Sequence, residues 1–353
     1  MPSKGVKMSD FLIEKEIKKL VEKNLEQVVD ALFIKEIVDS KKIPELTQAT
    51  YYQGKVRANF SGENLVAKDG RPLRIIIATD QISTHDQVRG AIPFRGQILT
   101  NISNEMLGIT EKFIPNAQIY APGNSAVVIS EDCAPYMFEM VWRTHMCKSS
   151  TETSLYYHYV NLGEREFCGH FLPEGLISNG PLPYMLDTPS TKASGEGEHD
   201  ISVSPGYLYQ HGIVLPYEYG KIAYMTGAAY LHVQNLFAKK GIIIPDTKFE
   251  LGKTKQGTII TIDEVLTPDS SRFWEAKDYK KKMADNEAPT SYSKQFGRNI
   301  GTPGQPYTED ERFLIGCRYI ETYQKLMGKR FIPDKRPPLQ RIIDDVRQSL
   351  AQV

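Results

Sequence analysis

Polar and apolar side chains alternate in one segment late in the chain, PDTKFELG. Asp246, Lys248 and Glu250 occupy every second position, and the residues between them are Thr and Phe. Since successive side chains of a strand point to opposite faces, the three charged groups share one face. Residues 253–257 (KTKQG) suit a turn, and residues 259–262 (IITI) form a β-branched run that is typical of a strand. The pattern predicts an antiparallel hairpin.

Apolar positions spaced by three and four residues predict helices elsewhere. Residues 9–37 show this spacing and predict an amphipathic helix, used for packing or for forming a homo-oligomer. A second helix is expected over residues 217–240, ending at a glycine. A T-x-x-E capping box at Thr308 opens a third helix, and residues 338–350 predict a last one. The charged stretch after Trp274 is expected to be a solvated loop.

The composition limits the classes of protein to consider. The chain has 353 residues with 43 Lys and Arg and 43 Asp and Glu, so its formal net charge is zero. This balance argues against a general nucleic-acid or membrane-surface binder. The four cysteines show no CxxC pair or zinc spacing, and no apolar run reaches the length of a membrane span, about 18 residues. Without a signal-peptide pattern, we expect a cytoplasmic protein with no nucleic-acid or membrane partner.

The predicted hairpin brings acidic groups together. A turn centred near residue 255 or 256 places Glu250 across from Asp263, within a residue or two. Two carboxylates held this close repel each other unless a cation lies between them, and Lys248 on the same face suits a triphosphate. The spacing therefore suggests a Mg²⁺-nucleotide site with Glu250 and Asp263 as metal ligands. The alternative is an ordinary strand followed by a charged loop.

The loop after the second strand carries groups that suit an anion. Asp269, Ser270, Ser271 and Arg272 follow a Thr-Pro turn shortly after Asp263. Arginine and hydroxyl groups bind phosphate or carboxylate, whereas carboxylates bind Mg²⁺. A site that binds both a metal and an anionic substrate would need this combination.

The segments PDTKFELG and IDEVLTPDSSRFW resemble the signature segments of the SAICAR synthetase family, the phosphoribosylaminoimidazole-succinocarboxamide synthases of purine biosynthesis. Other segments resemble family motifs in the same order along the chain: YYQGKVRANF, LRIIIATDQISTHD, AIPFRGQILTNIS, YMFEMVWR, TPSTK with GEHD, and SYSKQFGR. The resemblance runs from about Tyr52 to about Arg298. Agreement at one motif arises easily by chance, but agreement at all of them in order does not.

The resemblance implies a set of site residues. The catalytic residues would be Asp246, Lys248, Glu250 and Asp263, with Glu250 and Asp263 holding Mg²⁺. The ATP-binding residues would be Gly54, Lys55, Val56, Arg57, Glu139, Val141, Lys192 and Lys248, and the backbone near Glu139 to Val141 would meet the adenine. The substrate-binding residues would be Ser83, Asp86, Arg143, Ser149, Asp200, Asp269, Ser270, Arg272, Lys294 and Arg298.

Three segments depart from the family pattern. Thr84 and His85 replace small and aromatic residues, Lys148 replaces a glycine, and Ser293 and Asn299 replace two acids. Lys148 could add a phosphate contact or alter its loop, and the sequence alone does not decide between these two effects.

The resemblance also implies the fold and the reaction. The fold would be α+β, with an N-terminal helical extension (1–48), a β-rich N-terminal lobe (49–138), an ATP-grasp-like nucleotide and substrate lobe (139–300) and C-terminal packing helices (301–353). The enzyme would be an ATP-dependent ligase that joins L-aspartate to CAIR, 5-amino-1-(5-phosphoribosyl)imidazole-4-carboxylate, through an acyl phosphate. Its products would be SAICAR, ADP and phosphate. The alternatives are a phosphotransferase with a related ATP-binding core that acts on a hydroxyl group, and a catalytically inactive binding protein.

Overall fold

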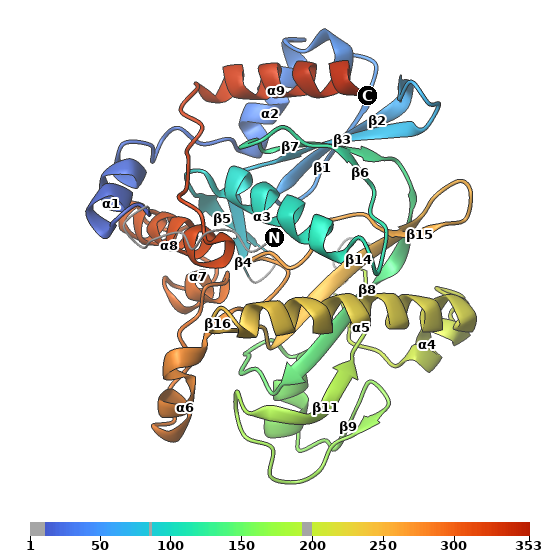
Figure 1. Ribbon diagram of the computed structural model, residues 1–353, viewed down its shortest axis with the longest axis vertical. Helices are drawn as coiled ribbons and strands as arrows, with labels where there is room; N and C mark the ends of the chain where they lie inside the picture. The colour runs from blue at the N-terminus through green and yellow to red at the C-terminus, as the bar shows by residue number, and fades with distance from the viewer. Residues whose placement is uncertain (1–10, 85–86, 193–199) are drawn as a thin grey trace. The chain divides into compact units, whose positions relative to one another are not determined.

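The computed structural model describes residues 11–84, 87–192 and 200–353. The chain forms two compact units. The first comprises the chain up to Glu105 together with Ala117–Asp132 and Tyr292–Val353, and the second comprises Met106–Asn116 and Cys133–Ser291. Both units combine helices with antiparallel sheets (Figure 1), so the predicted α+β class is confirmed. The lobe boundaries expected after residues 48, 138 and 300 stay predictions.

The first unit is built on a five-stranded antiparallel sheet with the order β1-β2-β3-β7-β6. Its strands are β1 (Thr50–Gln53), β2 (Arg57–Val66), β3 (Pro72–Ala78), β6 (Gln118–Tyr120) and β7 (Val127–Glu131). A separate hairpin pairs β4 (Gln81–Thr84) with β5 (Gln87–Ala91). Ile75 and Ile77 of β3 lie two residues apart, so both side chains point to the same face, where they join the core.

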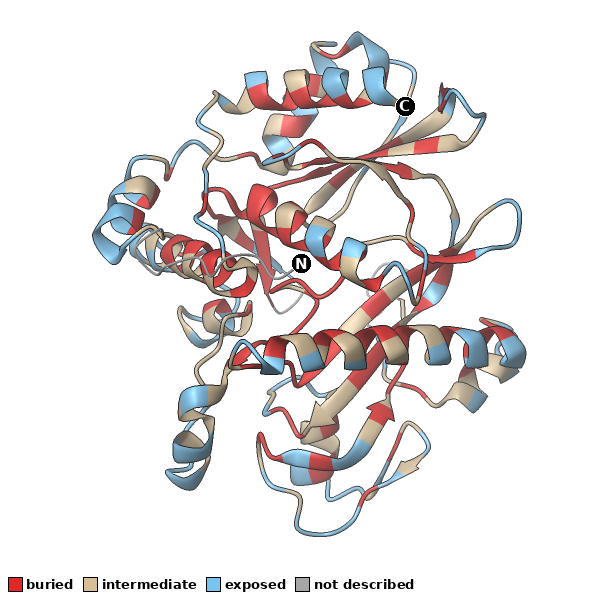
Figure 2. Cartoon of the chain, viewed as in Figure 1, coloured by how far each residue is buried: buried red, intermediate tan, exposed pale blue. Residues whose placement is uncertain are grey.

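Helices from both ends of the chain contribute to that core. Ile34 and Ile37 of α2 (Ala31–Asp39) and Ile342 and Val346 of α9 (Pro338–Gln352) belong to the same buried cluster as Ile75. Figure 2 shows that the buried positions of α9 lie along one side of the helix. The other helices that begin in this unit are α1 (Glu14–Glu22), η2 (Pro44–Leu46), α3 (Arg95–Thr110), α7 (Gln295–Asn299) and α8 (Glu309–Met327).

The single helix predicted over residues 9–37 is wrong, because α1 and α2 are separate helices. Asp30 has an extended backbone, and its side chain accepts a hydrogen bond from Phe33 N at 2.8 Å, so it caps a new helix. Leu32, on the predicted apolar stripe, is 77% exposed. The capping box at Thr308 is confirmed, since Thr308 and Glu311 exchange side chain-to-backbone hydrogen bonds at the start of α8.

The second unit contains a sheet with the order β11-β8-β14-β15, and β12 also pairs with β8. Its strands are β8 (Ala134–His145), β11 (Pro181–Asp187), β12 (Ser190–Thr191), β14 (Asp246–Lys253) and β15 (Ile259–Thr261). Two small pairs are β9 (Glu166–Phe167) with β10 (His170–Phe171), and β13 (Ile242–Ile243) with β16 (Trp274–Glu275).

The long helix of the second unit confirms the prediction over residues 217–240. It is α5 (Pro216–Ala238), and Gly241 beyond its end has a φ of +73°. Its buried Thr226 accepts a hydrogen bond from Trp142 Nε1 of β8 at 2.9 Å. The other helices are η3 (Tyr157–Asn161), α4 (Pro205–Gln210) and α6 (Ala276–Ala284). The loop expected after Trp274 is wrong in conformation, because that stretch forms α6, although none of its residues is buried.

The hairpin predicted from the alternation pattern is confirmed. β14 and β15 pair antiparallel, with Leu251 opposite Thr261 and Gly252 opposite Ile260. Ile262 N donates a hydrogen bond to Glu250 O at 3.1 Å, so the residue opposite Glu250 is Ile262. The predicted pairing with Asp263 is therefore displaced by one position, within the stated range.

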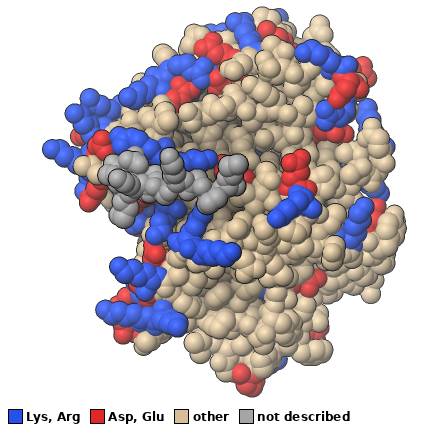
Figure 3. Space-filling view, viewed as in Figure 1, with Lys and Arg blue, Asp and Glu red and all other residues tan. Residues whose placement is uncertain are grey.

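The surface and the helices add two observations about possible environments. On the face drawn in Figure 3, basic and acidic side chains lie interspersed among uncharged ones, in keeping with the balanced composition. Within residues 11–84, 87–192 and 200–353, no helix is both long enough and apolar enough to cross a membrane.

Candidate active site

The paired strands β8 and β14 place six of the predicted site residues of the second unit on one face. Asp246 lies opposite Arg143, Lys248 opposite Val141, and Glu250 opposite Glu139. Because side chains two residues apart on a strand point the same way, these pairs form successive rows on one face, about 7 Å apart. The face carries two groups of charged side chains, one at each end.

The first group, here called the carboxylate–lysine cluster, consists of Glu139, Lys192, Lys248 and Glu250. Lys248 Nζ lies 2.6 Å from Glu139 Oε1 and 3.2 Å from Glu250 Oε1. Lys192 Nζ lies 2.6 Å from Glu250 Oε2. Each Glu250 oxygen therefore accepts from a different ammonium group, and Lys248 joins carboxylates on two neighbouring strands.

The charges of this cluster depend on one another. Burial alone would raise the pKa of Glu250, but Lys248 and Lys192 outweigh burial and hold that pKa well below its ordinary value. Burial raises the pKa of Glu139, and the nearby Glu250 and Asp200 add to the rise. The arrangement favours an ionised Glu250 and makes Glu139 the easier carboxylate to protonate.

Lys248 is held as a cation by its acidic surroundings. Burial would lower the pKa of Lys248, but Glu139, Glu250 and Asp263 raise it well above its ordinary value. Asp263 therefore lies near enough to Lys248 for its charge to act on that ammonium group. The predicted binding of Mg²⁺ by Asp263 together with Glu250 stays a prediction, and the two residues are not directly paired across the hairpin.

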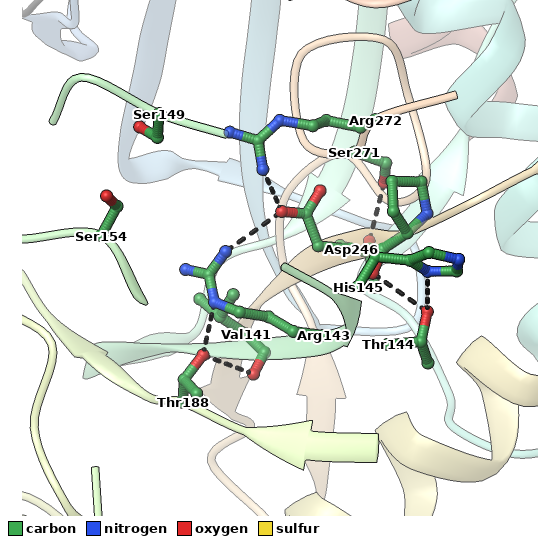
Figure 4. A network of polar contacts seen from close by, with 12 residues as sticks. Val141, Arg143, Thr144, His145, Ser149, Ser154, Thr188, Asp246, Ser271 and Arg272 are labelled. Carbon is green, nitrogen blue, oxygen red and sulfur yellow. Dashed lines mark hydrogen bonds and ion pairs between the residues drawn. The ribbon is translucent and has the colours of Figure 1, made fainter. Parts of the chain in front are cut away.

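The second group, here called the arginine cluster, consists of Arg143, Asp246 and Arg272. Arg143 Nη1 donates to Asp246 Oδ2 at 3.0 Å, and Arg272 Nη1 donates to the same oxygen. Arg143 Nε also donates to Thr188 Oγ1 at 2.9 Å. Figure 4 shows both guanidinium groups pointing toward Asp246. One carboxylate therefore fixes two arginines and leaves the cluster with a net positive charge.

The predicted catalytic role of Asp246 stays a prediction. Its carboxylate lies with Arg143 and Arg272 rather than with the carboxylate–lysine cluster. Asp246 lies at the opposite end of the strand face from Glu250. Its ion pairs with Arg143 and Arg272 orient these two arginines.

The loop before Arg272 is fastened to the edge of β14. Lys248 N donates to Ser270 O at 2.9 Å, and Arg272 N donates to Asp246 O at 3.3 Å. The hydroxyl groups of Thr247 and Ser271 share a hydrogen bond of 2.7 Å. The TPDSSR segment therefore pairs with the part of β14 that β15 does not reach.

Ser270 lies inside the turn before Arg272, and its predicted contact with the substrate stays a prediction. It is 6% exposed, and its hydroxyl accepts from Thr267 N at 3.0 Å inside the turn. The hydroxyl thus stabilises the loop that carries Arg272. Asp269, two residues after Thr267, is half-buried, and its backbone N donates to Thr267 Oγ1 at 3.3 Å.

Two serines lie on the guanidinium side of the arginine cluster. Ser149 and Ser154 are drawn there in Figure 4, and Ser149 was among the predicted substrate-binding residues. Ser149 Oγ accepts from Thr151 N at 3.2 Å, and Ser154 Oγ accepts from Tyr157 N at 3.2 Å. Both hydroxyl groups keep a hydrogen to donate, as a bound anion requires.

The stretch expected to meet the adenine lies inside the sheet. β8 is flanked by β14 on one side and by β11 and β12 on the other, and Val141 O accepts from Thr188 N at 2.8 Å. This carbonyl oxygen already accepts a hydrogen bond from the backbone of the chain itself. The adenine contact near Glu139 to Val141 stays a prediction, whereas the Glu139 side chain lies in the carboxylate–lysine cluster.

The remaining predicted residues belong to the first unit. Gly54–Arg57 forms the turn between β1 and β2, closed by a 2.8 Å hydrogen bond from Gly54 N to Arg57 O. Ser83 is buried in β4, Lys294 precedes α7, and Arg298 lies within it. Asp86 lies outside the described residues. Their predicted roles toward ligands stay predictions.

Some polar groups of this face were missed by sequence reasoning. They are Thr188 beside Arg143, Ser154 in the loop after β8, and the carboxylate of Glu139. Thr188 begins the TPSTK motif, so its presence in a motif was the available signal. Its partner, however, lies on another strand, and only the β11–β8 register brings the two together.

Glu250 and Asp263 are the predicted ligands for Mg²⁺. In the described part of the chain, no group of three or more His, Cys, Asp or Glu side chains is arranged to hold a metal ion. This suits Mg²⁺, which is usually bound by one or two carboxylates together with phosphate oxygens and waters. The ionised Glu250 and the nearby Asp263 therefore fit Mg²⁺ in the presence of a phosphate ligand.

Comparisons with known proteins decide the family. The family model for SAICAR synthetase matches residues 50–312. The chain belongs to the SAICAR synthetase family. The predicted family is therefore confirmed, and the motifs that suggested it lie within the matched segment.

Individual members of the SAICAR synthetase family match over most of their length. The phosphoribosylaminoimidazole-succinocarboxamide synthase of Cytophaga hutchinsonii is 36% identical over 316 residues, covering 86% of this chain and 96% of that protein. The enzyme of the same name from Flavobacterium psychrophilum is 33% identical over 296 residues, covering 81% of this chain and 89% of that protein. The structure of SAICAR synthase from Saccharomyces cerevisiae complexed with SAICAR matches with a TM-score of 0.65 and 26% identity, covering 80% of this chain and 96% of that one.

Proposed function

We propose that this protein is the ATP-dependent ligase that joins L-aspartate to the carboxylate of CAIR, giving SAICAR, ADP and phosphate in purine biosynthesis. Membership of the SAICAR synthetase family supports this reaction. The structural observation that carries the proposal is the pair of charged clusters on one strand face. Glu250 and Asp246 are four residues apart on β14, a span of about 13 Å in a strand. A nucleotide and a phosphorylated substrate can therefore be held side by side.

The chemistry calls for two such clusters. A carboxylate is a poor acyl donor, because the oxide that would have to leave is strongly basic. Phosphorylation by ATP turns the CAIR carboxylate into an acyl phosphate. The amine of aspartate then attacks the acyl carbon, and phosphate leaves. Catalysis of phosphoryl transfer depends mainly on positioning the groups and neutralising charge.

The carboxylate–lysine cluster would serve the nucleotide phosphates. Lys248 is held protonated by its surroundings and is suited to a phosphate oxygen, and Lys192 would act beside it. Glu250 and Asp263 would hold Mg²⁺, which when bound neutralises phosphate charge and aligns the phosphoryl group. The turn Gly54–Arg57 would supply backbone and basic contacts to the phosphates.

The arginine cluster would bind the 5-phosphate of CAIR. Arg143 and Arg272 present several N–H donors, and Asp246 and Thr188 fix their orientation through the contacts described above. Ser149 would add a hydroxyl donor. The other proposed substrate contacts are Ser83, Asp86, Asp200, Asp269, Ser270, Lys294 and Arg298.

The phosphotransferase alternative receives no support. It explains the carboxylate–lysine cluster, but it gives no reason for a second, cationic cluster on the same strand face. The relatives that match most of this chain are succinocarboxamide synthases. A cytoplasmic location and a homo-oligomeric state remain part of the proposal.

The direct test is ADP release from Mg²⁺-ATP with CAIR present, with and without L-aspartate. The proposal expects ADP release that requires both substrates, with SAICAR formed in equal amount. ADP release that another acceptor supports, and that aspartate does not affect, would identify a phosphotransferase instead.

A further inference from the structure

Thr188, which orients Arg143, directly follows β11 and lies between two short pairings with β8. β11 pairs with β8 at Pro181, loses register, and resumes pairing only at Leu186 and Asp187. The next residue, Thr188, then adds a backbone hydrogen bond to Val141 O. Beyond Pro189 the chain pairs with β8 again through β12, with Ser190 opposite Glu139. Two short backbone pairings, one before and one after Thr188, therefore help to set its position.

Side chains supply a second constraint at this point. His170 Nε2 lies 2.9 Å from Asp187 O and 2.9 Å from Asp187 Oδ1, so a proton on this nitrogen serves both oxygens. Tyr219 of α5 donates to Asp187 Oδ2 at 2.6 Å. Hydrogen bonds from β10 and α5, two elements outside the β11–β8 pair, thus hold Asp187 in place. Thr188 follows Asp187 directly.

Thr188 connects Asp187 to the arginine cluster. Thr188 is fully buried, and its hydroxyl accepts from Arg143 Nε at 2.9 Å and lies 3.3 Å from Val141 O, to which it donates. Arg143 in turn donates to Asp246. A displacement of Thr188 would therefore change the direction in which the Arg143 guanidinium is presented.

We propose that His170 is a positioning residue for the phosphate of the substrate: paired with Asp187, it fixes Thr188 and thereby the orientation of Arg143. This inference rests on the proposed function, since it assigns the arginine cluster to a substrate phosphate. His170 touches no reacting group, and its effect is expected on substrate binding rather than on the chemical step.

The pairing gives substrate binding a dependence on pH. The hydrogen bond to Asp187 raises the pKa of His170 above its ordinary value of 6.5, and burial opposes this less strongly. Burial alone would raise the pKa of Asp187, but hydrogen bonds from His170 and Tyr219 hold it below its ordinary value. The ion pair is therefore complete below pH 6.5 and is lost as the pH rises through the raised pKa of His170.

Among the described residues, the other titratable groups beside His170 and Asp187 are tyrosines and a cysteine. They are Tyr184 of β11, Tyr209 of α4, Tyr219 of α5 and Cys168. Burial raises the pKa of Tyr219 above its ordinary value, and burial raises the pKa of Cys168 to about 12. Both groups therefore stay neutral where His170 loses its proton.

The test compares the wild-type protein with His170→Gln in steady-state kinetics between about pH 6 and pH 8.5, where histidine titrates. At the lower pH, the variant should raise KM for CAIR by about threefold to tenfold, as expected for loss of a charge-assisted hydrogen bond, while kcat and KM for ATP change by less than about twofold. In the wild type, KM for CAIR should rise with pH more steeply than in the variant, because the substrate phosphate titrates equally in both.

Two controls separate positioning from general damage. His211→Gln makes the same substitution at an exposed position at the end of α4, where Nδ1 contacts Tyr207 O, and should leave every parameter unchanged. Tyr219→Phe removes the other donor to Asp187, so it should raise KM for CAIR at every pH without flattening the pH profile. A His170→Gln variant with wild-type KM for CAIR at each pH, or with equal losses in all parameters, overturns the inference.

Binding of D-ribose 5-phosphate, measured by calorimetry, distinguishes this inference from the proposed function. If the wild type releases no ADP with CAIR but binds the sugar phosphate more weakly after His170→Gln, the ligase assignment fails and the positioning role stands. If the wild type turns over CAIR and the variant behaves identically, only the positioning role fails. If the wild type neither turns over CAIR nor binds the sugar phosphate, both fail.

Discussion

Among single residues, Glu250 shows how a nearly buried carboxylate can remain charged. Its side chain is 19% exposed, and burial at that level disfavours the ionised form. Two ammonium groups, from Lys192 and Lys248, each contact one of its oxygens. A triphosphate would attract the same two ammonium groups. Nucleotide binding would therefore move them away from Glu250 and leave its carboxylate oxygens for Mg²⁺.

Asp263→Asn tests the metal assignment. The substitution keeps the size of the side chain but removes the charge that Asp263 contributes near Lys248. We expect ATP turnover in the presence of CAIR and aspartate to fall by at least about a hundredfold, since neutralisation of phosphate charge is a main source of catalysis here. Thermal unfolding should change little.

The matched control for that variant is Asp285→Asn, at an exposed position at the end of α6. It should retain wild-type ADP release. Near-normal turnover in Asp263→Asn would remove Asp263 from the metal site.

Arg272→Ala tests the phosphate assignment of the arginine cluster. Arg272 shares Asp246 with Arg143, so Asp246 keeps one cationic partner when Arg272 is removed. We expect KM for CAIR to rise by about tenfold to a hundredfold, the loss typical of a charged hydrogen-bonding partner, with a much smaller change in KM for ATP. Arg272→Lys should recover only part of the loss, because it cannot form two parallel hydrogen bonds. Equal losses for CAIR and ATP would contradict the assignment.

At the level of secondary-structure elements, what could be predicted from the sequence was local. The alternation of Asp246, Lys248 and Glu250 fixed the strand face, and the short turn fixed the β14–β15 register to within one residue. The β8–β14 and β11–β8 registers join residues about a hundred and about forty positions apart, and no local pattern encodes them. The contacts that Asp246 and Thr188 make with Arg143 could not be predicted for that reason.

The break between α1 and α2 shows a different limit of sequence reasoning. The apolar spacing continues across it, but the Asp30 side chain competes for a backbone N–H and starts a new helix. An Asp before an apolar run is visible in the sequence, but the periodic spacing alone does not show that a new helix starts there.

Gly252→Ala tests whether the hairpin is as tightly packed as its position suggests. A Cβ at Gly252 would lie 2.6 Å from Ile262 Cγ2 and 3.1 Å from Ala134 O, so the strands on both sides would have to move. We expect the free energy of unfolding to fall by about 1–3 kcal/mol, the usual cost of overpacking. Denaturant unfolding monitored by circular dichroism measures this change.

Gly220→Ala is the control for that prediction. Gly220 lies on the exposed side of α5, and outside its own helix backbone no heavy atom of the described chain lies within 4 Å of the place a Cβ would occupy. The substitution should increase the free energy of unfolding by about 0.5–1 kcal/mol through helix propensity. A loss of stability at Gly220 similar to that at Gly252 would show that the hairpin is not specially constrained.

At the level of the whole molecule, the segment that matches the family model does not contain all of the core. The match covers residues 50–312, whereas α2 precedes it and α9 follows it. Both helices nevertheless contribute buried side chains to the cluster under the first sheet, together with β2, β3 and β7. The turn Gly54–Arg57 and Ser83 belong to the same unit, so the stability of their surroundings depends on helices that carry no motif.

Ile342→Ala tests this dependence. Ile342 is fully buried in α9, and its truncation should lower the free energy of unfolding of the first unit by about 2–5 kcal/mol, the range for removing a large aliphatic side chain from a core. Leu32→Ala in α2 is the control, because Leu32 is 77% exposed and its truncation should cost little. Hydrogen exchange at the amides of β2 and β3 measures the loss within this unit. If exchange there stayed at the wild-type rate in Ile342→Ala, the packing of α9 would not stabilise the first sheet. The surroundings of the turn Gly54–Arg57 would then not depend on this helix.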